Sequence, residues 1–164
     1  STGSFANSTG TWSLSPTLAD GFYTIEATAT DAVGNSDSRT SDLTVDTNLP
    51  TVAITTPAAA GTSTQDLSPS ISGTAEAGTD VVVSLIDSAG TTVYSQTFSS
   101  TSGAWSLGTP ALAEGTYTIS ATATDSGGNA STDTSDIRVD VTAPVVDITD
   151  PAAVSYTHLT LPTK

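Results

Sequence analysis

The sequence predicts an all-β protein made of β-sandwich units repeated in tandem, with about seven antiparallel strands in each complete unit. Three observations lead to this fold class. No long segment places apolar residues at the 3.6-residue spacing of a helix, whereas several short segments alternate apolar and polar residues with period two. The sequence also repeats along the chain at an offset of about 94 residues, with one complete unit between two partial copies.

The repeat is evident at the level of single residues. Trp12-Ser13-Leu14 returns 93 residues later as Trp105-Ser106-Leu107, and beyond one inserted residue the offset becomes 94. From Gly21 to Ala59 this offset gives 23 identities in 39 positions. Chance does not produce such agreement, so the sequence indicates tandem duplication.

The duplication divides the chain into five segments. Residues 1–46 are predicted to be the C-terminal part of a truncated repeat, 47–49 a linker, and 50–141 one complete repeat. Residues 142–153 are predicted to contain a linker and the first strand of a truncated third repeat. Residues 154–164 depart from the repeat and resemble a translated sequencing adapter, so we expect a non-native tail; a divergent native C-terminus is the alternative.

The complete repeat contains seven segments with strand character. In Thr116–Thr124 every second residue is apolar or aromatic and every residue between is Thr or Ser, as in a half-buried antiparallel strand. Turn-forming residues such as Asp87–Gly90 separate the segments. The predicted strands are 51–55, 69–74, 80–87, 92–98, 104–107, 116–124 and 135–140.

Seven short strands in about 92 residues are typical of an immunoglobulin-like sandwich. The sequence Glu114-Gly115-Thr116-Tyr117 also predicts a tyrosine corner, in which the phenol hydroxyl binds the backbone a few residues upstream. Ile119 occupies the place of the cysteine that follows this tyrosine in antibody domains, so an apolar contact is expected instead of a disulfide.

Composition excludes several classes of function. The chain has 17 Asp and Glu against 3 Lys and Arg, giving a net charge of −14. Such a chain cannot neutralise a phosphate backbone, so neither nucleic acid nor an anionic membrane is an expected partner. Without Cys, and with its one His and one Lys at His158 and Lys164, it is predicted not to be an enzyme. No apolar run is long enough to insert in a membrane.

Several motifs resemble those of bacterial Ig-like repeats. These are Ile71–Gly78 (ISGTAEAG), 103–107 (GAWSL), 115–119 (GTYTI), 121–125 (ATATD) and the linker 139–144 (VDVTAP). Such repeats build the stalks of large secreted adhesins and biofilm-associated proteins, typically substrates of type I secretion. The resemblance covers residues 1–153 and implies an extracellular or cell-surface location.

We therefore expect a structural stalk or spacer whose partners are neighbouring repeats of the same chain. Tandem units joined by short linkers form one-dimensional arrays, and a surface of Thr, Ser and acidic residues suits a non-sticking shaft. The alternative is an accessory Ig-like module that binds carbohydrate or another surface polymer for a secreted multidomain enzyme. That role usually needs exposed aromatic platforms, for which Phe22 and Tyr94 are the candidates.

Calcium at the junctions between repeats is the further expectation. In an antiparallel seven-strand sandwich, the second, fourth and sixth loops gather at the end where the chain enters, and acidic residues mark these loops. Oxygen ligands from several segments suit Ca²⁺, and adhesin repeats of the resembled kind often bind it between domains. Solvated loop acids are the alternative. The expected ligands are Asp20, Asp46, Glu76, Asp125 and Asn129 at one junction, and Glu114 and Asp140 at the other.

Overall fold

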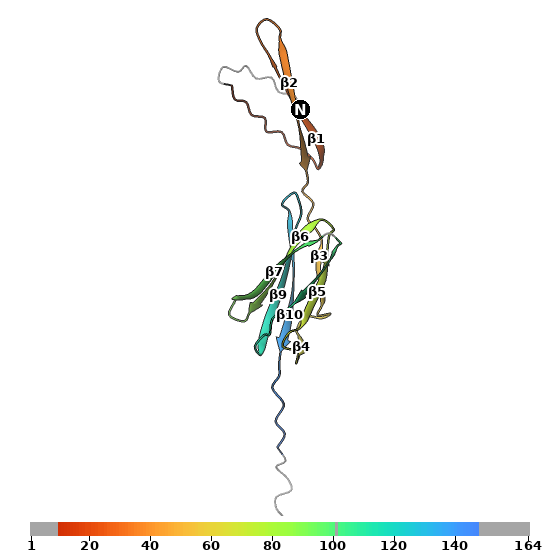
Figure 1. Ribbon diagram of the computed structural model, residues 1–164, viewed down its shortest axis with the longest axis vertical. Coiled ribbons are helices and arrows are strands. Elements are labelled where there is room, and N and C mark those ends of the chain that lie inside the picture. Colours follow the sequence, from red (N-terminus) through yellow and green to blue (C-terminus); the bar gives the residue numbers. More distant parts are fainter. Residues whose placement is uncertain (1–9, 101, 148–164) are drawn as a thin grey trace, which may run out of the picture.

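The protein consists of a β-hairpin and a β-sandwich that follow one another along its long axis (Figure 1). This computed structural model describes residues 10–100 and 102–147, and these residues form strands, turns and extended segments without a helix. Nothing in the described part therefore meets the length and apolarity that a membrane-spanning helix requires. The all-β class predicted from the sequence is confirmed.

The complete repeat is a sandwich of two sheets (Figure 1). The smaller sheet has the order β3-β5-β8, with β3 at Val52–Thr56, β5 at Ser70–Ala75 and β8 at Ala104–Gly108. The larger has the order β4-β10-β9-β6-β7, with β4 at Thr62–Thr64, β10 at Ala130–Val139, β9 at Gly115–Thr124, β6 at Thr79–Asp87 and β7 at Thr92–Ser100.

The core lies between the sheets and is made by the alternating residues of their strands. Val81, Val83 and Leu85 of β6 face inward, and each is fully buried. Trp105 is 4% exposed; its Nε1 donates to the Thr74 carbonyl oxygen at 3.3 Å. The remaining fully buried large side chains are Ile71, Leu107, Ile119 and Val139. The period-two pattern therefore identified the core faces correctly.

The hairpin repeats the last two strands of the sandwich. Strand β1 (Gly21–Thr30) pairs with β2 (Ser36–Val45), and Gly21 faces Val45 as Gly115 faces Val139. The register is the same along the whole pairing, because every partner pair in β1–β2 has its counterpart in β9–β10. Duplication in the sequence is therefore preserved as duplication in the backbone.

Two features of the sandwich differ from the sequence prediction. Strand β4 was not predicted: its three residues are polar, and it pairs in parallel with β10, so the unit is not purely antiparallel. Strand β10 begins at Ala130 and not at 135, because polar residues occupy its inward positions and hide the alternation. One of them, Asp133, accepts a hydrogen bond from the Ile54 amide of β3 at 2.8 Å.

The tyrosine corner is present in both copies. Tyr117 Oη donates to the Ala113 carbonyl oxygen at 3.0 Å, and Tyr23 Oη donates to the Ala19 carbonyl oxygen at 2.8 Å. This contact fixes the chain at the entry of β9 and of β1. It confirms the corner predicted at Tyr117, and the first copy has the same contact at Tyr23.

The segment after the sandwich is extended. Residues 142–147 form no strand, and Val145 and Val146 are 95% and 84% exposed. The rest of the predicted third repeat and the segment 154–164, for which we predict a non-native origin, lie outside the described residues.

Candidate functional site at the junction between repeats

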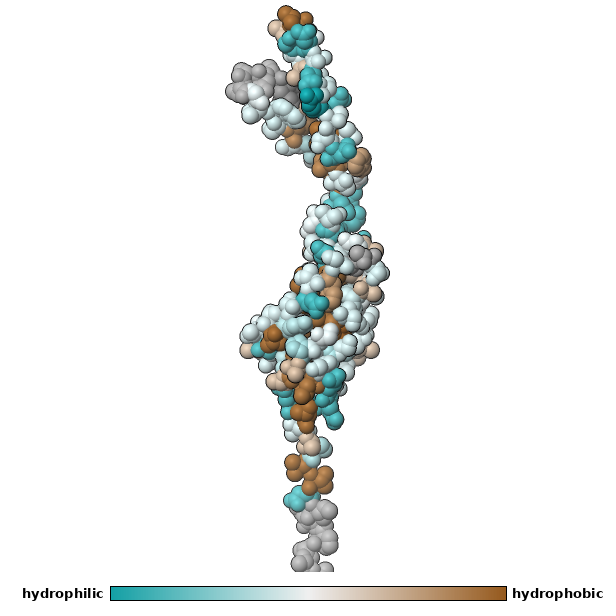
Figure 2. Space-filling view, in the orientation of Figure 1, coloured by the Kyte–Doolittle hydropathy of each residue, from teal (hydrophilic) through white to brown (hydrophobic). Residues whose placement is uncertain are grey.

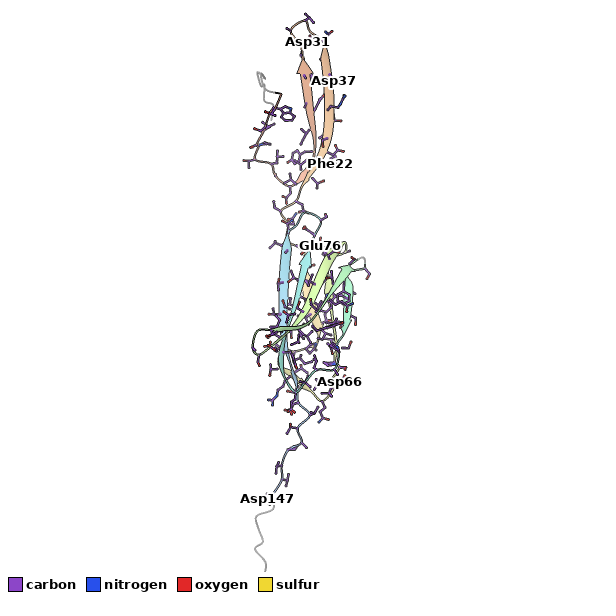
Figure 3. All side chains as sticks on the ribbon, turned by 60° about the vertical axis from the view of Figure 1, so that its left-hand side comes forward. Phe22, Asp31, Asp37, Asp66, Glu76 and Asp147 are labelled. Carbon is purple, nitrogen blue, oxygen red and sulfur yellow. The ribbon has the colours of Figure 1, made fainter. Side chains whose placement is uncertain are left out.

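The junction begins where the loop between β5 and β6 meets the entry of β3. The Glu76 amide donates to the Thr51 carbonyl oxygen at 2.9 Å, and Glu76 Oε2 accepts from the Thr51 amide at 3.4 Å. Figure 3 shows Glu76 at the end of the sandwich that faces the hairpin. The predicted gathering of loops at this end is therefore present for Glu76.

The turn between β9 and β10 lies at the same end. Asp125 Oδ1 accepts from the Asn129 amide at 2.9 Å, and Asp125 Oδ2 accepts from Asn129 Nδ2 at 3.0 Å. Gly128 has a φ of 88°, the left-handed region that glycine adopts without strain. These hydrogen bonds, first of all the one from the Asn129 side chain, hold the pKa of Asp125 below its ordinary value of 3.8.

Asn129 also connects the sandwich to the preceding repeat. Its Nδ2 donates to the backbone carbonyl oxygen of Asp46 at 3.0 Å. The approach is close, because a Cβ added at Gly127 would lie 3.5 Å from the same Asp46 oxygen. One amide side chain thus shapes the turn and spans the junction.

The linker itself is held from the hairpin side. Asp20 Oδ1 accepts from Thr47 Oγ1 at 2.7 Å and from the Thr47 amide at 3.1 Å, while Asp20 Oδ2 accepts from Asn48 Nδ2 at 3.0 Å. Asp46 Oδ1 accepts from the Asn48 amide at 3.0 Å and from Asn48 Nδ2 at 3.1 Å. We call these contacts, together with the Asn129–Asp46 bond, the junction clasp.

The far end of the complete repeat carries equivalent contacts. Glu114 and Thr142 stand 94 residues after Asp20 and Asn48, and Thr142 Oγ1 lies 2.8 and 2.9 Å from the two Glu114 carboxylate oxygens. Asp140 Oδ1 accepts from the Thr142 amide at 3.2 Å, as Asp46 accepts from Asn48. Asp140 additionally pairs with Arg138 at 3.1 Å.

The structure thus connects most of the predicted junction residues, but by hydrogen bonds from other protein groups. Asn48 donates to both Asp20 and Asp46, and Asn129 donates to the Asp46 carbonyl oxygen and to the Asp125 carboxylate. Glu76 accepts a hydrogen bond from the Thr51 amide. Within 10–100 and 102–147, no three acidic or histidine side chains converge as metal ligands would. The oxygens suit a hard cation, but their arrangement is not a calcium cage, and calcium binding stays a prediction.

Sequence reasoning missed the donors that lie in the linkers. It selected the carboxylates and Asn129, but not Thr47 and Asn48 of the clasp or Thr142 at the far end, which bind the carboxylates. A signal was available, since Asn48 and Thr142 are both polar and occupy the same repeat position, two residues after Asp46 and Asp140.

The hairpin tip offers an internal comparison for the Asp125 turn. Asn35 donates through its amide and Nδ2 to Asp31 at 2.8 and 2.7 Å, and the Asn35 side chain is the main cause of the lowered Asp31 pKa. Figure 3 places Asp31 at the tip far from the sandwich. The two turns therefore share their chemistry, and one of them faces a junction.

Substituting Asn129 with alanine is expected to raise the pKa of Asp125, because the largest stabiliser of the carboxylate is lost. A lowered pKa stabilises the folded state above 3.8, and this contribution is lost as the pH falls through the folded-state value. The variant should therefore lose less stability on acidification below about pH 4 than the natural chain. NMR titration of Asp125 measures the shift, and Asn35→Ala should raise the pKa of Asp31 alone.

The aromatic residues give little support to a carbohydrate platform. Tyr117 and Trp105 are buried, and Tyr94 and Phe98 pack against the core. Phe22 is 68% exposed on the hairpin, near its junction end in Figure 3. An exposed phenylalanine at the hairpin base is not the set of coplanar rings that sugar binding usually needs.

The comparisons with known proteins decide the family. The model of the bacterial Ig-like domain matches residues 1–47 and 51–141. The chain belongs to this bacterial Ig-like domain family. Domains of this family are generally non-catalytic. No curated protein matches the chain significantly.

Several solved structures resemble this bacterial Ig-like chain. CopC from Methylosinus trichosporium OB3b is 18% identical with a TM-score of 0.46, over 59% of this chain and 99% of its own. A tetra-tandem repeat in the extending region of a large adhesion protein is 30% identical with a TM-score of 0.45, over 76% of this chain and 33% of its own. The fibronectin(III)-like modules of Clostridium thermocellum CbhA are 22% identical with a TM-score of 0.44, over 74% of this chain and 64% of their own. The chain thus spans about a third of the adhesion-protein structure that it matches.

Proposed function

We propose that this chain is a spacer segment of a bacterial cell-surface adhesin, in which hydrogen-bonded junctions keep successive Ig-like repeats in line. The observation that carries the proposal is the occurrence of equivalent contacts at both ends of the complete repeat. Asp20–Asn48 precedes the repeat and Glu114–Thr142 follows it. A device that recurs once per repeat suits an array whose shape is set by nearest-neighbour contacts.

Each hydrogen bond of the clasp contributes little free energy alone, so the orientation of the repeats depends on several of them acting together. A hydrogen bond contributes about 0.5–1.5 kcal/mol net, and exposed ones lie at the lower end of that range. The clasp joins the linker to Asp20 and Asp46 on one side, and Asp46 to Asn129 on the other. Bending the linker therefore breaks several contacts together, which favours one relative orientation over a freely jointed chain.

The outer surface also suits a shaft exposed to solvent. Hydroxyl groups on neighbouring strands bind one another, as in Thr122–Thr132 at 2.8 Å and Thr28–Ser38 at 2.7 Å. Thr118 likewise donates to Asp136 at 2.8 Å. Figure 2 shows a mostly pale or teal surface with separate brown areas. Together with the net charge of −14, such a surface disfavours lateral association.

The proposed stiffness is measurable as a distance distribution. The chain contains no Cys, so Thr40→Cys and Ser88→Cys give two unique sites for spin labels, one on each side of the junction. Double electron–electron resonance should give one narrow distance peak. Asn129→Ala and Asn48→Ala should broaden it at least twofold, because each removes contacts of the clasp.

The matched control is Asn35→Ala, which removes the same type of turn contact at the hairpin tip and should leave the distribution unchanged. A natural chain with a distribution as broad as that of a flexible linker of similar length would refute the spacer proposal. Equal broadening by Asn35→Ala would show that the clasp does not set the orientation.

Calcium binding at this junction is proposed as an additional stabiliser. Since Thr47 and Asn48 already occupy the carboxylates of Asp20 and Asp46, an ion would replace some of these hydrogen bonds. We expect weak binding, on the order of 10⁻⁴–10⁻³ M as in extracellular modules.

The test of the calcium proposal is the same distance measurement and thermal unfolding, with Ca²⁺, with Mg²⁺ and with chelator. Ca²⁺ should narrow the distribution and raise the melting temperature, and Asp46→Asn combined with Asp125→Asn should remove both effects. If Ca²⁺ and chelator give the same distribution and melting temperature, the hydrogen bonds act alone and the spacer proposal remains.

A further inference from the structure

The two N-terminal strands of the complete repeat, β3 and β4, are both attached to its last strand, β10. Strand β4 pairs in parallel with β10 over its whole length. Two further backbone hydrogen bonds close this pairing at its ends. The Gly61 amide donates to the Asp136 carbonyl oxygen at 2.8 Å. The Asp140 amide donates to the Thr64 carbonyl oxygen at 2.9 Å.

A side chain connects β3 to the same strand, although β3 belongs to the other sheet. Asp133 of β10 is half-buried and lies on the same face as the buried Ile137. Its Oδ2 accepts from the Ile54 amide of β3 at 2.8 Å, and its Oδ1 accepts from the Thr134 amide at 2.9 Å, which holds the carboxylate in place. Because β3 is an edge strand of the small sheet, this hydrogen bond fastens that edge to the large sheet.

The chain enters and leaves the sandwich at opposite ends (Figure 1). It enters β3 at the end that faces the hairpin, and it leaves β10 at the far end, where the extended segment 142–147 follows. Tension along the chain therefore draws β3 and β4 toward the hairpin and β10 away from it. The strands are pulled past one another lengthwise, so the hydrogen bonds between them are strained together and not one after another.

We propose that the β4–β10 pair and the Asp133–Ile54 hydrogen bond form a latch that makes the complete repeat resist tension along the chain. These contacts must break before the two sheets can separate, so they raise the barrier to forced unfolding, which is a rate and not an equilibrium stability. The proposal concerns the strength of one repeat and the spacer proposal concerns the orientation of two, so either can fail without the other.

The test compares two directions of pulling on the full chain in optical tweezers. Ser1→Cys with Lys164→Cys places the handles at the chain ends, and the unfolding of the complete repeat is recognised by the contour length of residues 52–139. Gln65→Cys with Val141→Cys places both handles at one end of the β4–β10 pair, which then peels apart one residue pair at a time. The chain has no other Cys. Under the same constant load, the lifetime should be at least tenfold longer when the chain is pulled from its ends.

Asp133→Ala tests the side-chain part of the latch. It should shorten the lifetime under end-to-end load about tenfold, as expected for the loss of one hydrogen bond to a charged group, and should change the lifetime in the peeling direction by less than twofold. Asp133→Asn keeps an acceptor oxygen and should restore most of the lifetime. Asp136→Ala is the matched control, because this exposed acid of β10 binds Thr118 on the outer face and should leave both lifetimes unchanged.

Two proline substitutions test the backbone part. The N–H and C=O groups of one strand residue point to the same side, so the Thr64 amide faces β10 as its carbonyl oxygen does. Thr64→Pro removes this donor from the pairing and should shorten the end-to-end lifetime about tenfold, again the effect of about one hydrogen bond. The Ser63 amide points away from β10, where proline is tolerated at a sheet edge, so Ser63→Pro should have little effect.

Equal lifetimes in the two directions of pulling would overturn the proposal, because the resistance would then belong to the core as a whole. An unchanged end-to-end lifetime for either Asp133→Ala or Thr64→Pro would also overturn it. Circular dichroism shows whether each variant folds, and if either of these two does not, the direction of pulling and the other variant decide.

Discussion

Replacing Gly73 with alanine is expected to destabilise the complete repeat by about 3 kcal/mol or more, the upper part of the range for overpacked cores. Gly73 lies in β5 opposite Trp105 of β8, and the indole covers it. A Cβ there would overlap both the Trp105 ring and the backbone carbonyl oxygen of Ala53. One of these neighbours is main chain, so the clash cannot be relieved by a side-chain rotation alone.

The indole cannot move freely either. Its Nε1 is bound to the Thr74 carbonyl oxygen, and the ring packs against Phe98 with centroids 6.4 Å apart. A domain of this size is stable by about 5–15 kcal/mol, so a cost of this magnitude removes a large fraction of the total. The loss in the free energy of unfolding is measured by urea denaturation, with the hydrogen exchange of amides in β6 and β9 as the probe of the complete repeat.

Gly108 provides the matched control for this substitution. It lies in β8, which belongs to the same sheet as β5, it is exposed, and a Cβ there would meet nothing within 4 Å. Gly108→Ala should therefore change the stability by less than about 0.5 kcal/mol, as is usual at the surface. Similar effects of the two alanine substitutions would show that the packing of Trp105 on Gly73 does not limit the stability.

Much of the sandwich was predictable because its strands carry a strict alternation. In β9 the residues Tyr117, Ile119, Ala121 and Ala123 are buried and those between them are polar, so local sequence was enough to place both strand and face. The tyrosine corner was predictable for a similar reason, since its glycine and tyrosine are close in sequence and make a local contact.

The elements that were missed depend on distant partners. Strand β4 consists of Thr-Ser-Thr and exists because β10 offers it a parallel edge. The start of β10 was hidden by inward polar residues such as Asp133, whose place is explained by the Ile54 amide 79 positions away. Conversely, Trp12–Leu14 has the sequence of β8 and forms no strand, because β8 pairs only with β5 and the partial repeat has no such partner in the described residues.

The junction was predictable in position and less so in chemistry. Strand topology placed Glu76, Asp125 and Asn129 at the end where the chain enters. It did not reveal that the donors of the linker, Thr47 and Asn48, would occupy the carboxylates. Such pairings depend on side-chain directions within a three-residue linker, which alternation and composition do not encode.

Replacing Leu107 with alanine is the second substitution with a large expected effect, about 2–5 kcal/mol. Leu107 is fully buried in β8 between the two sheets, and truncation removes its apolar contacts and leaves a cavity. Leu14 is the equivalent residue of the first copy and is 44% exposed. Leu14→Ala should change the stability of the complete repeat by less than about 0.5 kcal/mol, because it lies outside that core.

Comparing the two substitutions distinguishes the effect of burial from that of local sequence, since both leucines belong to the motif Trp-Ser-Leu. Global hydrogen exchange in β6 and β9 reports the complete repeat, and exchange in β1 reports the hairpin. Leu107→Ala should accelerate the first, whereas Leu14→Ala should leave both unchanged. A loss of protection in β9 on Leu14→Ala alone would mean that the two copies share a cooperative core, because only then does a leucine outside the sandwich contribute to its stability.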